Sequence, residues 1–311
     1  MKQKTPKSNK GKWILIGIII LILTPILAGS LYVYLSNRNL YTSDEDILKT
    51  YKPSNEIEDI INKTKLTDKG KALLYRSDPQ FVDQETFQKA CGGGGREPLG
   101  CYSTKLGGIK IYLLQIDDPE LSDSKYFITM HEMLHAAFFR MNEQEKEEVS
   151  KLVQPEFAKR QDDGHLVDIV LTTQDDGVIE VVDQLHSYLG SEYENLSPEL
   201  EEHYKKYFQD RQIVIDLYKK SGYGSRVKQI DQLRADGKAL YTKIQAMAGE
   251  LTAAQNASDK SKFNSLIGEY ESLSAQYNSK RLQSEKLYSE IEEYYKFYNP
   301  DYTPPPPVKA F

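Results

Sequence analysis

Two histidines and a glutamate have types and spacing that can bind a metal ion and move a proton. They form the pattern His-Glu-x-x-His at His131, Glu132 and His135. On an α-helix, residues four apart project about 40° from each other, so both imidazoles can reach one Zn²⁺ ion. Glu132 would lie beside that ion without binding it, where a carboxylate can take a proton from water and pass it to a leaving amine. The pattern therefore predicts His131 and His135 as metal ligands and Glu132 as a general base.

The surroundings of the motif favour this interpretation over two ordinary histidines of an amphipathic helix. The chain has only five histidines, and the motif's neighbours from Met130 to Ala137 are uncharged apart from the motif itself. This composition predicts a buried helix, beginning near 122–124 and ending near 141. Residues 109–116 read as a strand. Zincins place a strand that binds extended substrate before the motif helix.

A catalytic zinc site needs a third protein ligand. The extended metzincin motif is excluded, because Phe138 and Met141 stand where it requires glycine and histidine. The candidates by residue type are Glu156, His165, Glu180, His186, Glu192 and Glu194. Glu156 lies in a charged segment, which is typical of a solvated face, and His165 follows a turn, which favours exposure. Residues 181–193 are the better source, because this apolar helix presents His186 and Glu192, and buried polar groups need partners.

Three stretches resemble an uncharacterised family of bacterial membrane-anchored proteins with the features of metallopeptidases. The stretches are Leu99–Tyr102, His131–Ala137, and Leu185–Glu192 with Leu200–Tyr204. The resemblance covers roughly residues 65–215, and the helical hairpin described below is similar in kind. It implies Glu192 as the third ligand, as in gluzincins, and it makes His186 a candidate second-shell group or transition-state hydrogen-bond donor. The family often has Glu where this chain has Gln184, so that position is not expected to be essential.

The N-terminus has the pattern of a membrane anchor. Residues 1–12 contain five lysines and no acid, and residues 13–35 contain no charge. A run of 23 residues matches the roughly 20 that a membrane-crossing helix needs. The lysines predict a cytoplasmic tail (1–12), a single-pass anchor in the cell membrane (13–35) and an extracytoplasmic body. The alternatives are a signal peptide cleaved near Ala28-Gly29-Ser30 and a buried core helix.

Cys91 and Cys101 bracket a glycine-rich loop. An extracytoplasmic location is oxidising, which favours a disulfide over a pair of free thiols. Two cysteines cannot make a cysteine-based zinc site alone, and residues 1–130 contain no histidine that could complete one.

The rest of the chain divides at about residue 221. Residues 36–221 are expected to form an α+β, zincin-like, mostly helical domain, with a short helix near 54–63 and further helices near 143–160, 178–189 and 198–220. From 230 to 254 and again from 263, apolar residues recur at intervals of three and four, which predicts an antiparallel helical hairpin over 222–298. That hairpin is a structural element or the binding surface for a protein partner. Residues 299–311 include four consecutive prolines and predict an extended tail.

These features predict a membrane-anchored zinc metallopeptidase that acts on polypeptide. The alternative is a membrane-tethered scaffold with a structural or degenerate zinc site, and an envelope amidase would use the same chemistry. Glu132 separates the first two, because a structural site has no use for a carboxylate beside an open metal position. The net charge is −6, so no nucleic-acid partner is expected.

Overall fold

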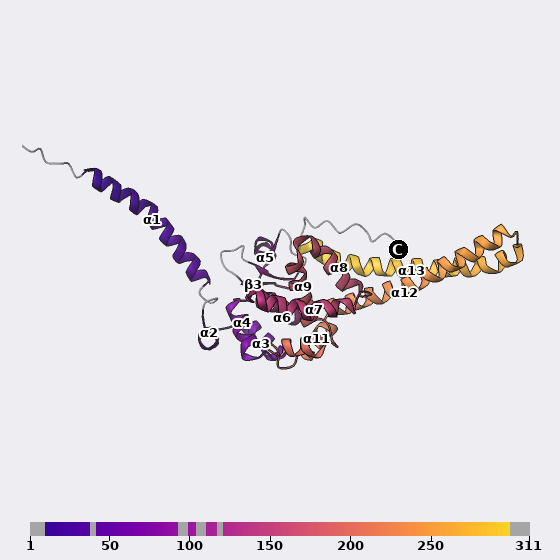
Figure 1. The fold of residues 1–311 in the computed structure, drawn as a ribbon, viewed down its shortest axis with the longest axis horizontal. Helices are drawn as coiled ribbons and strands as arrows, with labels where there is room; N and C mark the ends of the chain where they lie inside the picture. The colour runs from indigo at the N-terminus through magenta and orange to yellow at the C-terminus, as the bar shows by residue number, and fades with distance from the viewer. Residues whose placement is uncertain (1–9, 38–41, 93–98, 104–109, 117–120, 299–311) are drawn as a thin grey trace, which may run out of the picture.

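The computed structural model describes residues 10–37, 42–92, 99–103, 110–116 and 121–298 (Figure 1). Three predicted segments lie outside these residues: most of the lysine-rich tail (1–9), the glycine run between the cysteines (93–98) and the proline-rich tail (299–311). All structural statements below refer to the described part of the chain.

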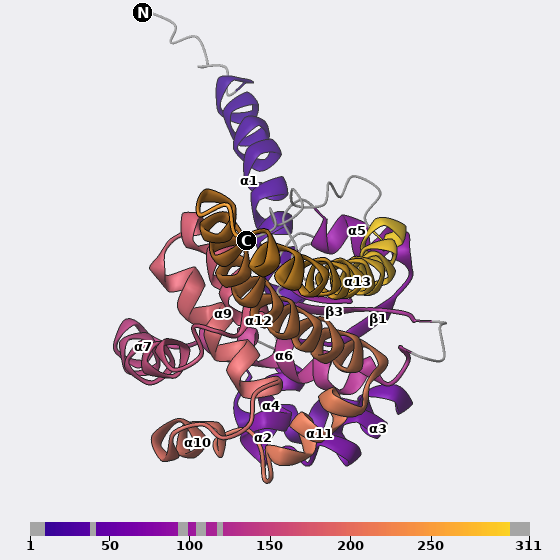
Figure 2. The ribbon, with the colours of Figure 1, turned by 90° about the vertical axis from the view of Figure 1, so that its right-hand side faces the viewer.

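The N-terminal helix α1 (Lys10–Asn37) extends away from the body (Figures 1 and 2). Its described apolar side chains are exposed, including Leu21, Ile26 and Leu31. Among the described residues, no helix combines the length and apolarity needed to cross a bilayer. The anchor over residues 13–35 stays a prediction from the sequence.

Three short helices open the body. They are α2 (Asp44–Thr50), α3 (Asn55–Thr64) and α4 (Asp68–Arg76), and each begins after a serine or threonine whose hydroxyl accepts a backbone N–H of the first turn. Such caps satisfy N–H groups that have no partner within the helix. The helix predicted near 54–63 is α3, and its isoleucines enter the core.

A three-stranded sheet lies beside the motif helix. Its strands are β1 (Gln80–Val82), β2 (Gly100–Ser103) and β3 (Lys110–Leu114), in the order β1-β3-β2. β3 pairs in parallel with β1 and antiparallel with β2. Helix α5 (Gln84–Cys91) packs on one side of the sheet and α6 (Ser124–Phe139) on the other (Figure 2).

This sheet order overturns one expectation. The strand predicted at 109–116 exists as β3, but it is central, so its backbone groups are paired on both sides and cannot bind an extended substrate. Among the described residues, β2 has one edge without a strand partner. Leu99 accepts a hydrogen bond from Leu114 of β3, and strand alternation then directs the N–H and C=O groups of Gly100 and Tyr102 toward the open edge.

The core surrounds the motif helix α6. Met130, Met133, Leu134 and Ala136 have no exposed surface, as expected for a helix that is apolar on every side. Helix α9 (Val178–Ser191) packs directly against it, and α7 (Glu143–Ala158) and α8 (Gly164–Thr173) pack on α9. A short 3₁₀ turn, Gln174–Asp176, joins α8 to α9. The predicted helices at 143–160 and 178–189 correspond to α7 and α9.

The single helix predicted over 198–220 is wrong, because the structure has two. They are α10 (Pro198–Tyr204) and α11 (Gln212–Lys220). Arg211 sits between them and donates to the carbonyl oxygens of Leu189 and Tyr193 at the end of α9. The apolar periodicity of residues 198–220 does not indicate this break, because the contacts of Arg211 are with the end of α9.

The C-terminal third forms the hairpin. Helices α12 (Gly222–Asn256) and α13 (Lys260–Tyr298) run side by side and project from the body (Figure 1). Tyr241 contacts Tyr277 across the pair, and Lys280 forms an ion pair with Asp236 at 2.6 Å. Only the first turns of α12 enter the body, where Val227 and Ile230 are buried.

Candidate metal centre

The motif residues lie on the buried middle of α6. His131, Glu132 and His135 are 4%, 1% and 7% exposed. The two imidazoles converge, with their Nε2 atoms 3.1 Å apart. The i, i+4 spacing therefore places the two rings together, as predicted from the helix periodicity.

Helix α9 supplies the outer contacts of both rings. Nδ1 of His131 lies 3.1 Å from Oγ of Ser191, and that hydroxyl donates to the carbonyl oxygen of Ser187 at 2.8 Å. Nδ1 of His135 lies 2.9 Å from a carboxylate oxygen of Asp183. Asp183, Ser187 and Ser191 recur every four residues, so they share one face of α9.

These contacts assign the protons on the rings. Because the only proton of Ser191 Oγ is directed to Ser187, His131 must donate from Nδ1. A carboxylate can only accept, so Asp183 favours the tautomer of His135 with its proton on Nδ1. Both neutral rings then present an Nε2 lone pair, and two lone pairs this close repel each other unless a cation lies between them. Zn–N bonds of about 2.0–2.1 Å in a tetrahedral site separate two ligand nitrogens by roughly 3.3–3.4 Å, close to the observed spacing. The pair therefore fits a divalent metal ion.

α9 can approach α6 this closely because residue 190 is glycine. A Cβ atom on Gly190 would lie 2.4 Å from a methyl carbon of Leu134 and 2.7 Å from the ring of Tyr204. Any side chain here would push α9 away from α6 and carry Asp183 and Ser191 away from the histidines.

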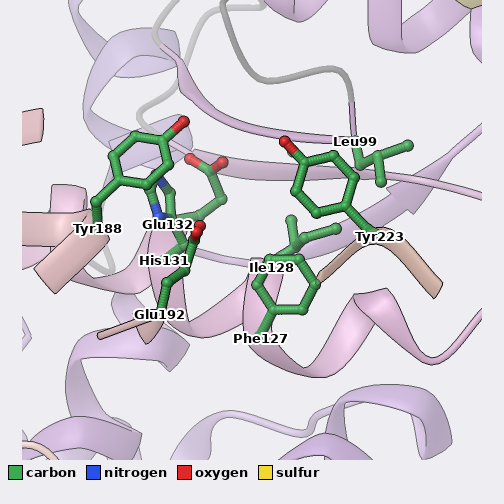
Figure 3. Close-up of a pocket in the computed structure, with 9 residues that line it drawn as sticks. Leu99, Phe127, Ile128, His131, Glu132, Tyr188, Glu192 and Tyr223 are labelled. Atoms are coloured by element: carbon green, nitrogen blue, oxygen red, sulfur yellow. The ribbon is translucent and has the colours of Figure 1, made fainter. Parts of the chain in front are cut away.

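A small cavity opens beside the histidines, with a polar end and an apolar end (Figure 3). His131, Glu132, Tyr188 and Glu192 gather at one end. The other end is formed by Leu99, Phe127, Ile128 and Tyr223. The cavity volume is about 30 Å³, which is room for an ion and a water molecule. A peptide substrate would require the cavity to widen.

Glu192 is the third-ligand candidate that shares this cavity. It is the residue that follows the last turn of α9 and is 6% exposed. Its Oε2 lies 3.5 Å from Nε2 of His165. The Glu192 carboxylate is also close to the Tyr218 hydroxyl. Burial raises the pKa of Tyr218 well above the ordinary tyrosine value, and the Glu192 charge adds to that rise.

Two other candidates lie in surroundings that the sequence did not predict. Glu156 is not on a solvated face: it is 1% exposed and accepts hydrogen bonds from Lys159 and from the backbone of Ser197. Burial opposes its ionisation, but contacts with Lys159 and Arg160 outweigh burial and lower its pKa. His165 is not well exposed either, since its side chain is 19% exposed and faces Glu192. Although burial works in the opposite direction, the nearby carboxylates of Glu192, Asp231 and Asp163 raise the pKa of His165.

The remaining candidates lie elsewhere. Glu180 is exposed, and Glu194 forms an ion pair with Lys219. His186 is fully buried, and its Nε2 lies 3.0 Å from Nε2 of His203. It packs against Phe138 behind the motif helix, and it is not one of the residues that line the described cavity. A direct hydrogen bond from His186 to a reacting group therefore has no support in this arrangement.

Sequence reasoning missed Asp183 and Ser191, although a signal was present. With Ser187 they are polar residues spaced four apart on a helix, a pattern that can mark a face turned toward buried polar groups. Within the described residues, no cluster of three or more His, Cys, Asp or Glu side chains already has the geometry of a metal site. Two nitrogens converge, and the Glu192 carboxylate lines the same cavity without joining them.

The cysteines lie on the far side of β2 from this cavity. Cys91, at the end of α5, and Cys101 form a disulfide with a Cα–Cα distance of 5.9 Å. The predicted pairing is confirmed. Comparison of the chain with family models, curated proteins and solved structures gave no match.

Proposed function

We propose that this chain is a zinc-dependent metallopeptidase, with His131 and His135 as ligands, Glu192 as the third ligand and Glu132 as the general base. The observation that carries the proposal is the pair of Nε2 atoms 3.1 Å apart, each on a ring whose Nδ1 lies beside a polar side chain of α9. Second-shell contacts of this kind orient the histidines of zinc sites. A carboxylate, Glu132, lines the same cavity.

Each residue then has a separate task. A bound zinc ion supplies Lewis-acid activation of a carbonyl group and of water. Glu132 accepts the proton of the attacking water and returns it to the leaving amine. Asp183 and Ser191 hold the histidine rings with their Nε2 atoms toward each other. The open edge of β2, at Gly100 and Tyr102, offers backbone groups to an extended polypeptide.

The exposed apolar surface of α1 supports a membrane location for this activity. A helix with exposed Leu21, Ile26 and Leu31 leaves apolar area in water, and a bilayer would remove that cost. We therefore propose a single-pass anchor, and the five lysines before it favour a cytoplasmic N-terminus with the catalytic body outside the cell.

The decisive experiment compares the wild-type chain with Glu132→Gln, both purified in detergent. Gln keeps the size of the side chain but cannot accept a proton. Zinc content should be unchanged, because Glu132 is not a ligand, while cleavage of unfolded polypeptide should fall about 10²–10⁴-fold. His131→Ala is the matched control and should lose zinc. Chelator-sensitive cleavage that is unchanged in Glu132→Gln would exclude this mechanism.

A tethered scaffold is the second candidate, and the hairpin favours it. α12 and α13 project far from the body and pack mainly on each other (Figure 1), which suits a protein-binding surface. Zinc-loaded wild-type chain that cleaves no polypeptide or other amide would support this candidate.

A further inference from the structure

His165 contacts the proposed third ligand from outside the cavity. It is the second residue of α8, whose N-terminus is capped by the side chain of Asp163. Its Nε2 lies 3.5 Å from Oε2 of Glu192, and the Glu192 side chain is only 3% exposed. His165 is absent from the residues that line the described cavity. It therefore contacts the carboxylate without forming part of the cavity wall.

The chain holds His165 in place from several directions. Its ring meets that of Tyr188 edge-on at 5.6 Å, and Tyr188 in turn meets His131 at 4.5 Å. The carboxylate of Asp163 accepts a hydrogen bond from the Tyr193 hydroxyl at 3.1 Å. Arg234 of α12 forms an ion pair with Asp168 of α8 at 3.4 Å. The cap of α8 is thus tied to the residue after Glu192, and the middle of α8 is tied to the hairpin.

Glu192 needs such a contact because its backbone does not determine its side-chain direction. It follows the last turn of α9 and has non-helical dihedral angles, φ −124° and ψ −24°. A carboxylate that ligates a metal through one oxygen is oriented by a donor on the other oxygen. Nε2 of His165 lies 3.5 Å from that second oxygen, and a protonated Nε2 is a donor.

We propose that His165 is a positioning residue that holds Oε2 of Glu192, so that the other carboxylate oxygen faces the two histidines. The inference rests on the proposed function, because it takes Glu192 as a zinc ligand. It assigns His165 no contact with substrate or metal. The interaction predicts that metal affinity depends on a donor at the position of His165 Nε2, and not on the bulk of the ring.

The test compares His165→Leu with His165→Gln in the full-length chain. The Gln amide can place an N–H donor near the Nε2 position, whereas Leu fills space without one. Zn²⁺ affinity is measured by chelator competition, and the visible spectrum of the Co²⁺-substituted protein reports the ligand geometry. For His165→Leu, we expect a 10- to 100-fold weaker Zn²⁺ affinity and an altered Co²⁺ spectrum. His165→Gln should retain the wild-type spectrum and an affinity within about threefold of wild type.

Two controls separate positioning from a general structural effect. Unfolding of the metal-free proteins shows whether Leu and Gln destabilise the fold equally. His203→Leu removes another buried histidine, whose partner is His186, and should leave the Co²⁺ spectrum unchanged. Wild-type affinity and spectrum in His165→Leu would overturn the inference, as would equal losses in His165→Leu and His165→Gln. Failure of wild type to bind Zn²⁺ or Co²⁺ would overturn the proposed function itself, and this inference with it.

Discussion

At the scale of single residues, the neighbours of each histidine decide what it can do. The Nε2 atoms of His131 and His135 lie 3.1 Å apart, while Ser191 and Asp183 lie beside their Nδ1 atoms. His186 and His203 instead contact each other away from the cavity. Identical side chains in one domain thus divide into a converging pair, which we propose binds metal, and a pair within the core.

Asp183→Ala tests the first of these arrangements. Without the carboxylate, His135 loses the contact that holds its ring and tautomer, so zinc affinity should fall about 10- to 100-fold. The measurement is chelator competition, with Glu180→Ala as control, because Glu180 is on the same helix but exposed. Equal zinc affinity in wild type and Asp183→Ala would refute the assigned role of Asp183.

At the scale of elements, strand β2 and helix α6 approach closely at one glycine. A Cβ atom on Gly100 would lie 2.8 Å from a carboxylate oxygen of Glu132 and 2.6 Å from a methyl carbon of Ile128. The disulfide at Cys101 ties this strand to α5, which limits how far β2 can move. Glycine is therefore required for the strand to pass the proposed general base.

Gly100→Ala should accordingly lower both stability and activity. Overpacking costs about 1–3 kcal/mol, which denaturant unfolding would measure, and displacement of Glu132 should reduce turnover. Gly249→Ala is the matched control: nothing lies within 4 Å of its added methyl group, and alanine stabilises a helix interior by about 1 kcal/mol. If Gly100→Ala kept wild-type stability and turnover, glycine would not be required for the close approach of β2 to Glu132.

At the scale of the whole molecule, the buried histidine pair links stability to pH. Burial lowers the pKa of His203 to about 4, and it lowers that of His186 well below the ordinary value. In the unfolded chain both histidines have the ordinary pKa of about 6.5 and take up protons as the pH falls below that value. In the folded protein both side chains stay neutral at the same pH. The unfolded state then binds more protons, so stability is full above about pH 6.5 and is lost as pH falls toward 4.

His203→Gln should remove part of this pH dependence. Between about pH 7.5 and pH 5, His203 should account for a loss of about 2 kcal/mol in the free energy of unfolding. Urea unfolding of the metal-free wild type and variant at both pH values measures the difference. Equal pH dependence in the two proteins would show that His203 is not held neutral by burial.

A feature of this fold could be predicted from the sequence when the interactions that produce it join residues close together along the chain. The motif spacing, the apolar periodicity and the capping residues act within one or two helical turns. These features were enough to predict α3, α6, α7, α9, the hairpin and the convergence of His131 with His135. The pairing of Cys91 with Cys101 was also predictable, because a short glycine-rich loop separates them.

Tertiary structure alone decided the rest, because the causes are contacts between distant segments. The order β1-β3-β2 makes β3 the central strand. The sequence pattern of β3 predicts a strand but does not indicate whether that strand is central or at an edge. Glu156 is buried because Ser197 and basic neighbours surround it. The packing of α9 across α6, made close by Gly190, brings Asp183 and Ser191 to the histidines. The start of α8 brings His165 to Glu192.

The sequence by itself thus determined a helix with two convergent imidazoles and a neighbouring carboxylate. Only the packing of α9 against that helix decided which side chains lie beside those imidazoles and which carboxylate lines the cavity at His131, because these contacts join residues with no periodic relation along the chain.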